Sequence, residues 1–402
     1  MSALAVWAAE QRAGLLDRTA DERQYVFAYD QSVSSPDAQV SLTMPLRLES
    51  WNSRDLHPIF QMNLPEGALL DAIRRALAKL AGEDDLTILR VTGGHQVGRN
   101  RFSLPGDAAP GIVETVESLD ALLSYPDTKE LFHDLVAKYA LRSGVSGVQP
   151  KVMLDALDRG TAAVGGYIVK SWGYEYPCLA ANEFFCMTAA QRAGLPVPEF
   201  RIADNGGLFV MKRFDLAADG SSLGFEDLCS LQALGTTEKY SSTYERAAKS
   251  IKDFVSGENL QSAREQLFAS LVLSSMVRNG DAHLKNFGVL YDNPGAPVRL
   301  APVYDVVTTT AYVPKDVPAL SLAGTKKWWQ RKTMEKFALT HLAVPVGRVG
   351  QILEQVAEAV TETRVELQEY INEHREFREV GKRMLAAWDA GVSGTLSTDS
   401  SS

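Results

Sequence analysis

The order in which strand and helix patterns follow one another most constrains the fold of this chain. Short apolar segments typical of strands dominate up to residue 215, and long apolar repeats at helical spacing dominate after it. The helices of this later part are expected at about residues 226–233, 242–256, 260–278, 328–340, 346–373 and 375–388. Because strands and helices are segregated and do not alternate as βαβ units, the pattern predicts an α+β fold.

The first 105 residues are expected to form a small unit of their own, with a sheet and a helix. The pattern predicts a helix after Pro65, a turn at residues 11–14, and strands at residues 3–10, 24–29 and 40–46. A linker rich in Pro and Gly follows residue 105. The chain is therefore divided into an N-terminal unit at 1–105, a strand-rich part with a loop and a hinge at 112–215, a helical part at 216–390 and a disordered tail at 391–402.

Composition is that of an ordinary globular protein, with 45% hydrophobic and 23% charged residues. The net charge of -9 argues against a general attraction to nucleic acid, although Lys326 and Lys327 with Arg331 and Lys332 could form a local basic face. The three cysteines fit neither a disulfide framework nor a zinc site. The N-terminus lacks the pattern of a secretion signal, and no apolar run is long enough to span a membrane, so a cytoplasmic location is expected.

A polar run at residues 278–288, between two apolar segments, is the strongest candidate for chemistry. Asp281 and Asn286 stand five residues apart in it, and Asp305 follows nineteen residues after Asn286. Phosphoryl transfer needs a carboxylate that takes the hydroxyl proton, and it needs oxygen ligands that hold magnesium on the phosphates. The run alone supports equally well the alternative that Asp281 and Asn286 cap a helix and shape a turn.

Two features upstream of this run suit a phosphate site. The loop at residues 143–151 contains small residues that can bring backbone N–H groups close to phosphate oxygens, although by itself it is more typical of a hairpin loop. Lys170 ends an expected strand and Glu183 lies on the next expected helix, and such a pair can orient phosphates. The alternative is that Lys170 is a solvated strand end and Glu183 a surface charge.

These features follow the order of parts in the protein-kinase fold, with a hinge strand at residues 209–215 between them. The motif sequences differ from those of eukaryotic-type kinases, because the histidine, His283, comes after Asp281 and because Val306 comes directly after Asp305. The run instead resembles the HipA family, the serine/threonine-kinase toxins of HipBA-type toxin–antitoxin modules. Similar blocks occur at residues 60–67, 146–151, 182–187, 212–215, 226–229 and 302–305.

The resemblance implies ATP and Mg²⁺ as cofactors and a role for each matching residue. Asp281 would be the catalytic base, Asn286 and Asp305 would bind magnesium, and Lys170 would contact the phosphates, oriented by Glu183. The remaining assignments are local support from His283 and Lys285, adenine binding by the backbone of Lys212 and Phe214 with Tyr304 packed nearby, and a phosphate-covering loop that includes Ser146, Gly147, Val148, Gln149 and Lys151.

The same resemblance implies a control by phosphorylation in the loop. Family members can be silenced by phosphorylation of a loop serine, and Gly144 occupies the position that aligns with it here. Ser143 and Ser146 are the nearest serines, and either could take the role, with Ser143 slightly preferred. A phosphate there would place about two negative charges beside a site that binds phosphates.

Family properties also imply the partners. They are a HipB-like helix-turn-helix antitoxin, operator DNA reached through that antitoxin, and a protein substrate such as an aminoacyl-tRNA synthetase, whose modification stops growth. Two other readings remain open, namely a catalytically silent corepressor that binds the antitoxin, and a small-molecule kinase of the same fold. The presence of Asp281, Asn286, Asp305 and Lys170 favours an active enzyme.

Overall fold

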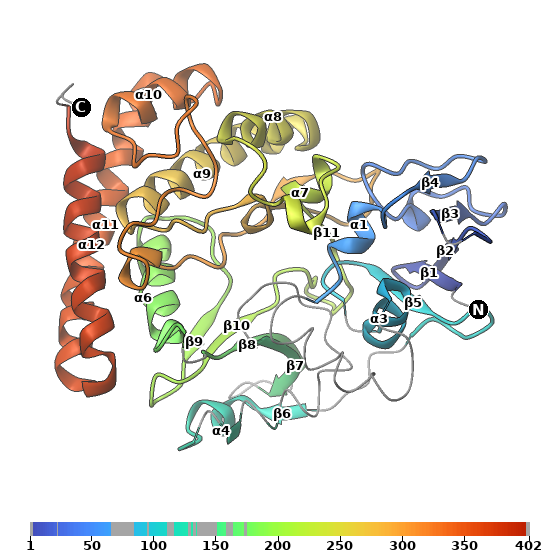
Figure 1. The fold of residues 1–402 in the computed structure, drawn as a ribbon, viewed down its shortest axis with the longest axis horizontal. Coiled ribbons are helices and arrows are strands. Elements are labelled where there is room, and N and C mark those ends of the chain that lie inside the picture. The colour runs from blue at the N-terminus through green and yellow to red at the C-terminus, as the bar shows by residue number, and fades with distance from the viewer. Residues whose placement is uncertain are drawn as a thin grey trace. The chain divides into compact units, whose positions relative to one another are not determined.

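A computed structural model describes residues 3–21, 23–65, 84–94, 96–110, 116–127, 130, 131, 134, 151–157, 164–172 and 175–398. The chain forms two compact units, and each is described by itself (Figure 1). The first unit comprises Met1–Ser171, Ala203–Thr237 and Val289–Val298, and the second comprises Trp172–Ile202, Glu238–Gly288 and Arg299–Ser402. The first carries the large sheets and the second is mainly helical, which confirms the predicted α+β fold.

The N-terminal part of the first unit is built on an antiparallel five-stranded sheet in the order β4-β3-β2-β1-β5. The strands are β1 (Leu4–Ala8), β2 (Gln11–Arg18), β3 (Tyr25–Tyr29), β4 (Trp51–Ser53) and β5 (Asn100–Ser103). Phe27, Phe60 and Phe102 pack edge to face on it, with ring centroids 5.3 and 5.9 Å apart. Helical segments follow at η1 (Pro36–Ala38), α1 (Pro58–Gln61) and α3 (Asp85–Thr92), and the helix expected after Pro65 lies outside the described residues.

Two details of this sheet differ from the expectations. The turn predicted at residues 11–14 is wrong, because the chain reverses earlier, at Ala9 with φ 53°, and Gln11 already pairs with Ala8. The strand predicted at residues 40–46 is also wrong. There the Tyr29 hydroxyl donates to the Met44 carbonyl and accepts from the Val40 N–H. A side chain, and not a neighbouring strand, thus provides hydrogen-bond partners for this backbone, which does not join the sheet.

A second sheet carries the strand lysine. Within the first unit its order is β6 (Val116–Ser118), β7 (Lys151–Leu157), β8 (Val164–Lys170) and β10 (Phe209–Lys212), and α4 (Leu119–Leu123) follows β6. The register pairs Lys170 with Lys151 on one side and with Phe209 on the other. The sheet thus brings the strand lysine, the start of β7 and the beginning of the hinge strand into one row.

Buried charges fasten the hinge strand to the N-terminal sheet within the first unit. Asp215, 1% exposed, forms an ion pair of 2.6 Å with Arg213 and accepts the Gly98 N–H at 2.7 Å. Arg213 also donates to the Gln96 carbonyl at 3.0 Å. The pKa of Asp215 is lowered despite the opposing effect of burial, since Arg213, the Gly98 N–H and Arg101 all stabilise its charge.

Asp215→Ala is expected to destabilise the protein by about 3–5 kcal/mol, because it leaves the buried guanidinium of Arg213 without its counter-ion. Chemical denaturation followed by fluorescence measures this change. Asp219→Ala is the matched control, since Asp219 is fully exposed and bonds only to Ser221. Equal denaturation midpoints for the two variants would contradict the assigned role of Asp215.

Glu226 is a second buried acid in the first unit. It lies on β11 (Gly224–Asp227), which pairs with β12 (Gly288–Tyr291), and it accepts hydrogen bonds from Ser41, the Leu42 N–H and the Tyr291 hydroxyl. Burial raises its pKa to about 7. The helix expected from residue 226 therefore begins later, as α7 (Leu228–Leu231), because β11 occupies the first positions, and η3 (Thr236–Glu238) follows.

The second unit packs long helices at the expected positions. They are α6 (Leu179–Arg192), α8 (Tyr244–Phe254), α9 (Gly257–Met276), α10 (Arg331–Thr340), α11 (Val346–Glu373) and α12 (Arg378–Leu396), with β9 (Phe200–Ile202), β13 (Arg299–Leu300), η4 (Leu284–Asn286), η5 (Thr309–Ala311) and η6 (Arg375–Phe377) between them. The last turns of α9 are buried throughout, and α6, α11 and α12 pack around it (Figure 1). Among the described residues, no helix has the length and apolar character to cross a membrane.

The tail begins later than expected. Residues 391–396 continue α12, where Gly391 lies against the backbone of Met276 and the Thr395 and Ser275 hydroxyls bond at 2.8 Å. A composition typical of disorder is overridden here by packing on α9.

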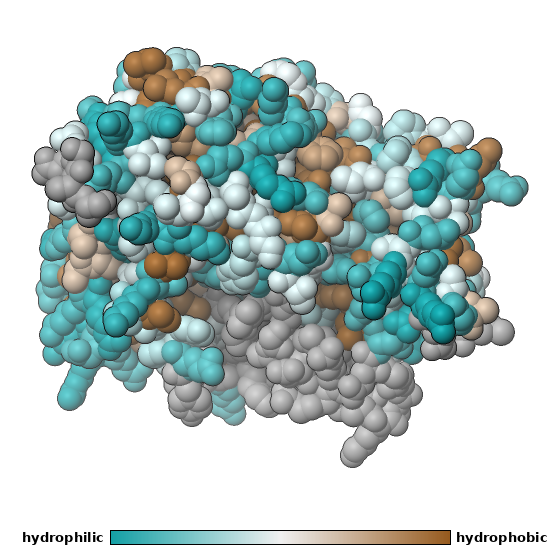
Figure 2. Space-filling view, turned by 45° about the horizontal axis from the view of Figure 1, so that its top comes forward, coloured by the Kyte–Doolittle hydropathy of each residue, from teal (hydrophilic) through white to brown (hydrophobic). Residues whose placement is uncertain are grey.

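On the face drawn in Figure 2, hydrophilic residues prevail and hydrophobic ones form small scattered patches.

Candidate active site

The polar run predicted for chemistry forms a tight loop after α9. Arg278 leaves the helix with φ 58°, and a short 3-10 turn, η4, closes the loop. The His283 N–H donates both to the Asn286 side-chain oxygen at 3.1 Å and to the Asp281 carbonyl at 2.7 Å. Asn286 therefore does shape a turn, as the alternative reading held, but only its amide oxygen is used for this.

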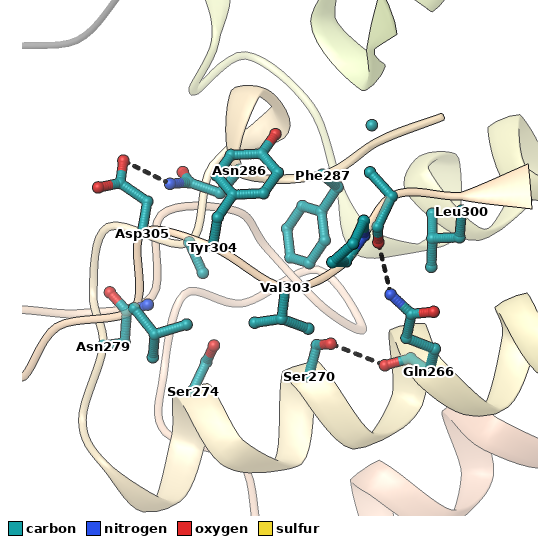
Figure 3. A pocket seen from close by; sticks show the side chains of 15 residues that line it. Gln266, Ser270, Ser274, Asn279, Asn286, Phe287, Leu300, Val303, Tyr304 and Asp305 are labelled. Atoms are coloured by element: carbon teal, nitrogen blue, oxygen red, sulfur yellow. Dashed lines mark hydrogen bonds between the residues drawn. The ribbon is translucent and has the colours of Figure 1, made fainter. Parts of the chain in front are cut away.

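The other end of the Asn286 amide points to Asp305. Its Nδ2 donates to Asp305 Oδ2 at 3.2 Å (Figure 3). Asp305 has φ 61°, a left-handed conformation that a residue other than glycine seldom adopts. Tyr304 holds the same segment to the loop, since its hydroxyl donates to the Lys285 carbonyl at 2.7 Å. The structure thus brings together two of the residues that the sequence placed nineteen positions apart.

Asp281 is a half-buried carboxyl in an acidic neighbourhood. Its pKa is raised to about 6, chiefly by desolvation and also by the negative charges of Asp305 and Asp316, whereas a hydrogen bond from Tyr240 and the charge of Lys239 oppose the rise. The Tyr240 hydroxyl donates to Asp281 Oδ1 at 2.7 Å. A carboxyl with this pKa is ionised near neutral pH and still accepts a proton readily, as a general base requires.

Tyr240→Phe is expected to shift the acid limb of any activity that needs ionised Asp281 to higher pH. The wild-type limb should have its midpoint near the pKa of about 6, with activity lost as pH falls. The hydroxyl stabilises the carboxylate, so its loss raises the pKa and moves the midpoint upward. The pH–rate profile of kcat/KM measures the shift. Tyr176→Phe serves as the control, because Tyr176 is a comparably exposed tyrosine that packs on Tyr312. An unmoved or lowered midpoint in Tyr240→Phe would contradict the assignment.

His283 and Lys285 each contact a tyrosine of the site. His283 is buried, and burial together with Lys239 lowers its pKa to about 3, so the imidazole is neutral. Its ring meets that of Tyr240 edge to face at 5.1 Å, and it thereby supports the residue that bonds to Asp281. Lys285 contributes its backbone carbonyl to Tyr304. Tyr240, Lys239 and Asp316 were missed by sequence reasoning, because their contacts with Asp281 join segments far apart in the chain.

A pocket in the second unit lies beside this pair of segments. It is lined by the end of α9, by residues 286–288 and by residues 300–306 (Figure 3). Asp305 supplies carboxylate oxygens, and magnesium favours oxygen ligands with one or two carboxylates. The Asn286 amide oxygen accepts the His283 N–H and keeps a second lone pair that can bind a metal. The negative charges of Asp281, Asp305 and Asp316 also attract a cation. The residues present therefore fit a divalent metal.

Most of the residues expected to bind nucleotide lie in the first unit, whereas Glu183, Tyr304 and Asp305 lie in the second. Lys170 is 2% exposed, with its ammonium 5.7 Å from the centre of the Phe209 ring, and Glu183 of the second unit is 0% exposed. The alternative of a solvated strand end and a surface charge is therefore wrong. Lys212 is exposed at the end of β10, and Phe214 packs on Phe225 at 5.6 Å. Ser143, Gly144, Ser146, Gly147, Val148 and Gln149 lie outside the described residues, and only the backbone position of Lys151 in β7 is described.

Comparison with known proteins finds relatives that are named as putative kinases and a solved structure with the same fold. Two relatives from Sinorhizobium fredii carry the names "Putative kinase Y4mE", 28% identical over 80% of this chain and 82% of its own length, and "Putative kinase Y4dM", 28% identical over 71% and 70%. The HipA chain in a solved complex of the Shewanella oneidensis toxin–antitoxin system shares the fold, with a TM-score of 0.65, 16% identity and 96% of each chain covered.

Family matches cover most of the sequence. Residues 4–103 match the HipA N-terminal domain. Residues 143–364, more than half of the chain, match the HipA-like C-terminal domain. The kinase order of parts, the loop of Asp281 and Asn286 and the apposed Asp305 all fall within the second match. The chain belongs to the HipA family, whose fold is kinase-like.

Proposed function

We propose that this protein is an ATP-dependent serine/threonine protein kinase and the toxin of a type II toxin–antitoxin system in the cytoplasm. The observation that carries the proposal is the half-buried Asp281, with a pKa raised to about 6, in a loop whose Asn286 bonds to Asp305. A carboxylate base next to a pair of oxygen ligands is the set of groups that phosphoryl transfer requires.

Each residue has a task in this mechanism. Asp281 accepts the proton of the substrate hydroxyl as that oxygen bonds to the γ-phosphorus and the bond from the γ-phosphorus to the bridging oxygen breaks, with ADP as the leaving group. Tyr240 holds the carboxylate in place. Asn286 and Asp305 would hold Mg²⁺, which when bound would neutralise charge on the phosphates. His283 remains neutral and supports Tyr240. These groups position and stabilise charge, and they form no covalent intermediate with the phosphoryl group.

The nucleotide assignments rest on the family resemblance. Lys170, oriented by Glu183, would bind phosphate oxygens, and the backbone of Lys212 and Phe214 would hold the adenine with Tyr304 nearby. The loop that includes Ser146, Gly147, Val148, Gln149 and Lys151 would cover the phosphates, and Ser143 or Ser146 would be the site of inhibitory autophosphorylation. Phosphopeptide mapping after incubation with ATP tests this last point, and an absence of label at residues 143–146 would count against it.

The partner is proposed to be a HipB-like helix-turn-helix antitoxin. One solved structure that shares the fold is the HipA of a Shewanella oneidensis complex that also contains HipB and its operator DNA. A net charge of -9 suits a protein that reaches DNA through a basic partner rather than directly. The division between residues 1–105, 112–215 and 216 onward is likewise retained as a proposal, whereas the tail expected at 391–402 starts only after Leu396, the end of α12.

A labelling experiment tests the function and separates it from the two alternatives. The purified protein is incubated with γ-labelled ATP and a cell lysate, and phosphorylated products are identified by mass spectrometry. Phosphoserine or phosphothreonine on a host protein, for example an aminoacyl-tRNA synthetase, is the expected result. ATP consumption with label only on a small molecule would indicate a small-molecule kinase. No transfer, together with antitoxin binding, would indicate a silent corepressor.

A further inference from the structure

The C-terminal helix α12 begins after the last residue of either family match. Those matches end at residue 364, whereas α12 spans Arg378–Leu396. Nevertheless it packs along α9 and α11 and against η5 in the second unit (Figure 1). Its contacts reach both of the segments that carry the candidate catalytic residues.

The first contact reaches the segment of Asp305. Thr308, three residues after Asp305, is fully buried, and its hydroxyl accepts the indole N–H of Trp388 at 2.7 Å. The backbone of Thr308 is held at the same time by Asn182 on α6, which accepts from its N–H at 2.7 Å and donates to its carbonyl at 3.1 Å. Every polar group of Thr308 is thus bonded to a helix.

The second contact reaches the loop of Asp281. Arg278, at the start of that loop, donates to the carbonyl of Ala390 on α12 at 2.9 Å. Thr309 joins the two segments, because its hydroxyl donates to the Arg278 carbonyl at 3.2 Å and accepts the Gly280 N–H at 2.8 Å. Arg383 of α12 adds a bond to the carbonyl of Ala311 at 3.1 Å.

The backbone conformation explains why such bracing is needed. Arg278 and Asp305 both have positive φ, 58° and 61°, although neither is a glycine. Strained residues of this kind persist only where the surrounding structure holds them in place. The hydrogen bonds of Thr309 connect the segment after Asp305 with the loop that begins at Arg278. Helix α12 bonds to both segments, through Trp388 to Thr308 and through the Ala390 carbonyl to Arg278.

We propose that α12 is a brace for the active site, and that Trp388, acting through Thr308, is a positioning residue for Asp305. This inference rests on the proposed metal-binding role of Asp305. The buried Trp388 side chain touches neither Asp281 nor Asp305 in any hydrogen bond described, and it acts by limiting the conformations open to residues 305–309. Removal of a group that orients a metal ligand without touching the metal commonly changes metal affinity.

Trp388→Phe tests the brace, because it removes the indole N–H and retains most of the aromatic volume. Trp329→Phe is the matched control: Trp329 is also buried in the second unit, packs on Tyr244 at 5.5 Å, and its indole N–H has no hydrogen-bond partner among the described residues. Amide hydrogen exchange of a peptide that covers residues 303–311 is the first readout. Faster exchange is expected in Trp388→Phe and wild-type exchange in Trp329→Phe.

The second readout is the Mg²⁺ dependence of binding of a non-hydrolysable ATP analogue, measured by calorimetry. Trp388→Phe should need about tenfold more Mg²⁺ for half-maximal binding. Thr308→Val should behave in the same way, and Thr308→Ser, which keeps the hydroxyl, should restore the wild-type response. Equal behaviour of the two tryptophan variants in exchange would overturn the brace. If the wild-type protein binds no nucleotide, the proposed function fails, and the exchange experiment still decides the role of α12.

Discussion

Asp281→Asn is expected to lower phosphoryl transfer by about 100- to 10,000-fold, the range that general-base catalysis contributes. Asparagine has the same shape but cannot accept a proton from the substrate hydroxyl at neutral pH. Initial rates of phosphate transfer from labelled ATP measure the loss. Asp253→Asn is the control, since Asp253 is an exposed aspartate of the same unit whose ion pair with Lys249 lies on α8.

The same substitution should leave the fold intact or make it more stable. The pKa of Asp281 in the folded protein, about 6, lies above its ordinary value of 3.8, so folding favours the protonated form. The stability associated with that form is present below pH 3.8 and is lost as pH rises through about 6. Above that pH a neutral asparagine avoids the burial of a charge near Asp305 and Asp316. Thermal unfolding at pH 7.5 should therefore show an unchanged or higher Tm, and retained activity with a wild-type Tm would refute the catalytic assignment.

Asp305→Asn is expected to remove most of the response of the protein to Mg²⁺, with a loss of transfer of about 100-fold or more, because a carboxylate supplies the charge that holds the metal. Asparagine is the informative choice at this position. It tolerates the left-handed backbone better than most residues do, so the conformation with φ 61° is retained. It can also still accept the bond from Asn286.

Rates and nucleotide affinity are measured across a Mg²⁺ titration for this variant. Asp305→Ala, in contrast, adds backbone strain and should also lower Tm, so the two variants separate metal binding from stability. Asp389→Asn, on the exposed face of α12, is the control for a change of charge, since Asp389 bonds only to Arg364 among the contacts described. A Mg²⁺ response of Asp305→Asn that matches the wild type would show that Asp305 does not hold the metal.

The sequence was informative wherever one short segment carried the signal. The long helices α9 and α11 start and end close to the predicted positions, because their apolar residues recur at helical spacing over many turns. The loop of Asp281 and Asn286 was recognisable because polar residues are concentrated there between apolar segments. The errors at residues 11–14 and 40–46 arose where a single backbone reversal or one tyrosine hydroxyl overrode local pattern.

Local sequence by itself determined the α+β class, the helices and the identity of the groups that could carry out phosphoryl transfer, because these depend on periodicity and residue type. Only the tertiary structure decided the pKa of these groups and their positions relative to one another. The hydrogen bonds from Tyr240 to Asp281 and from Trp388 to Thr308 join residues many positions apart. The left-handed conformation of Asp305 likewise depends on its surroundings in the folded chain. Such contacts are made by packing between helices and loops, and the desolvation and strain that they create leave no mark in the local sequence pattern.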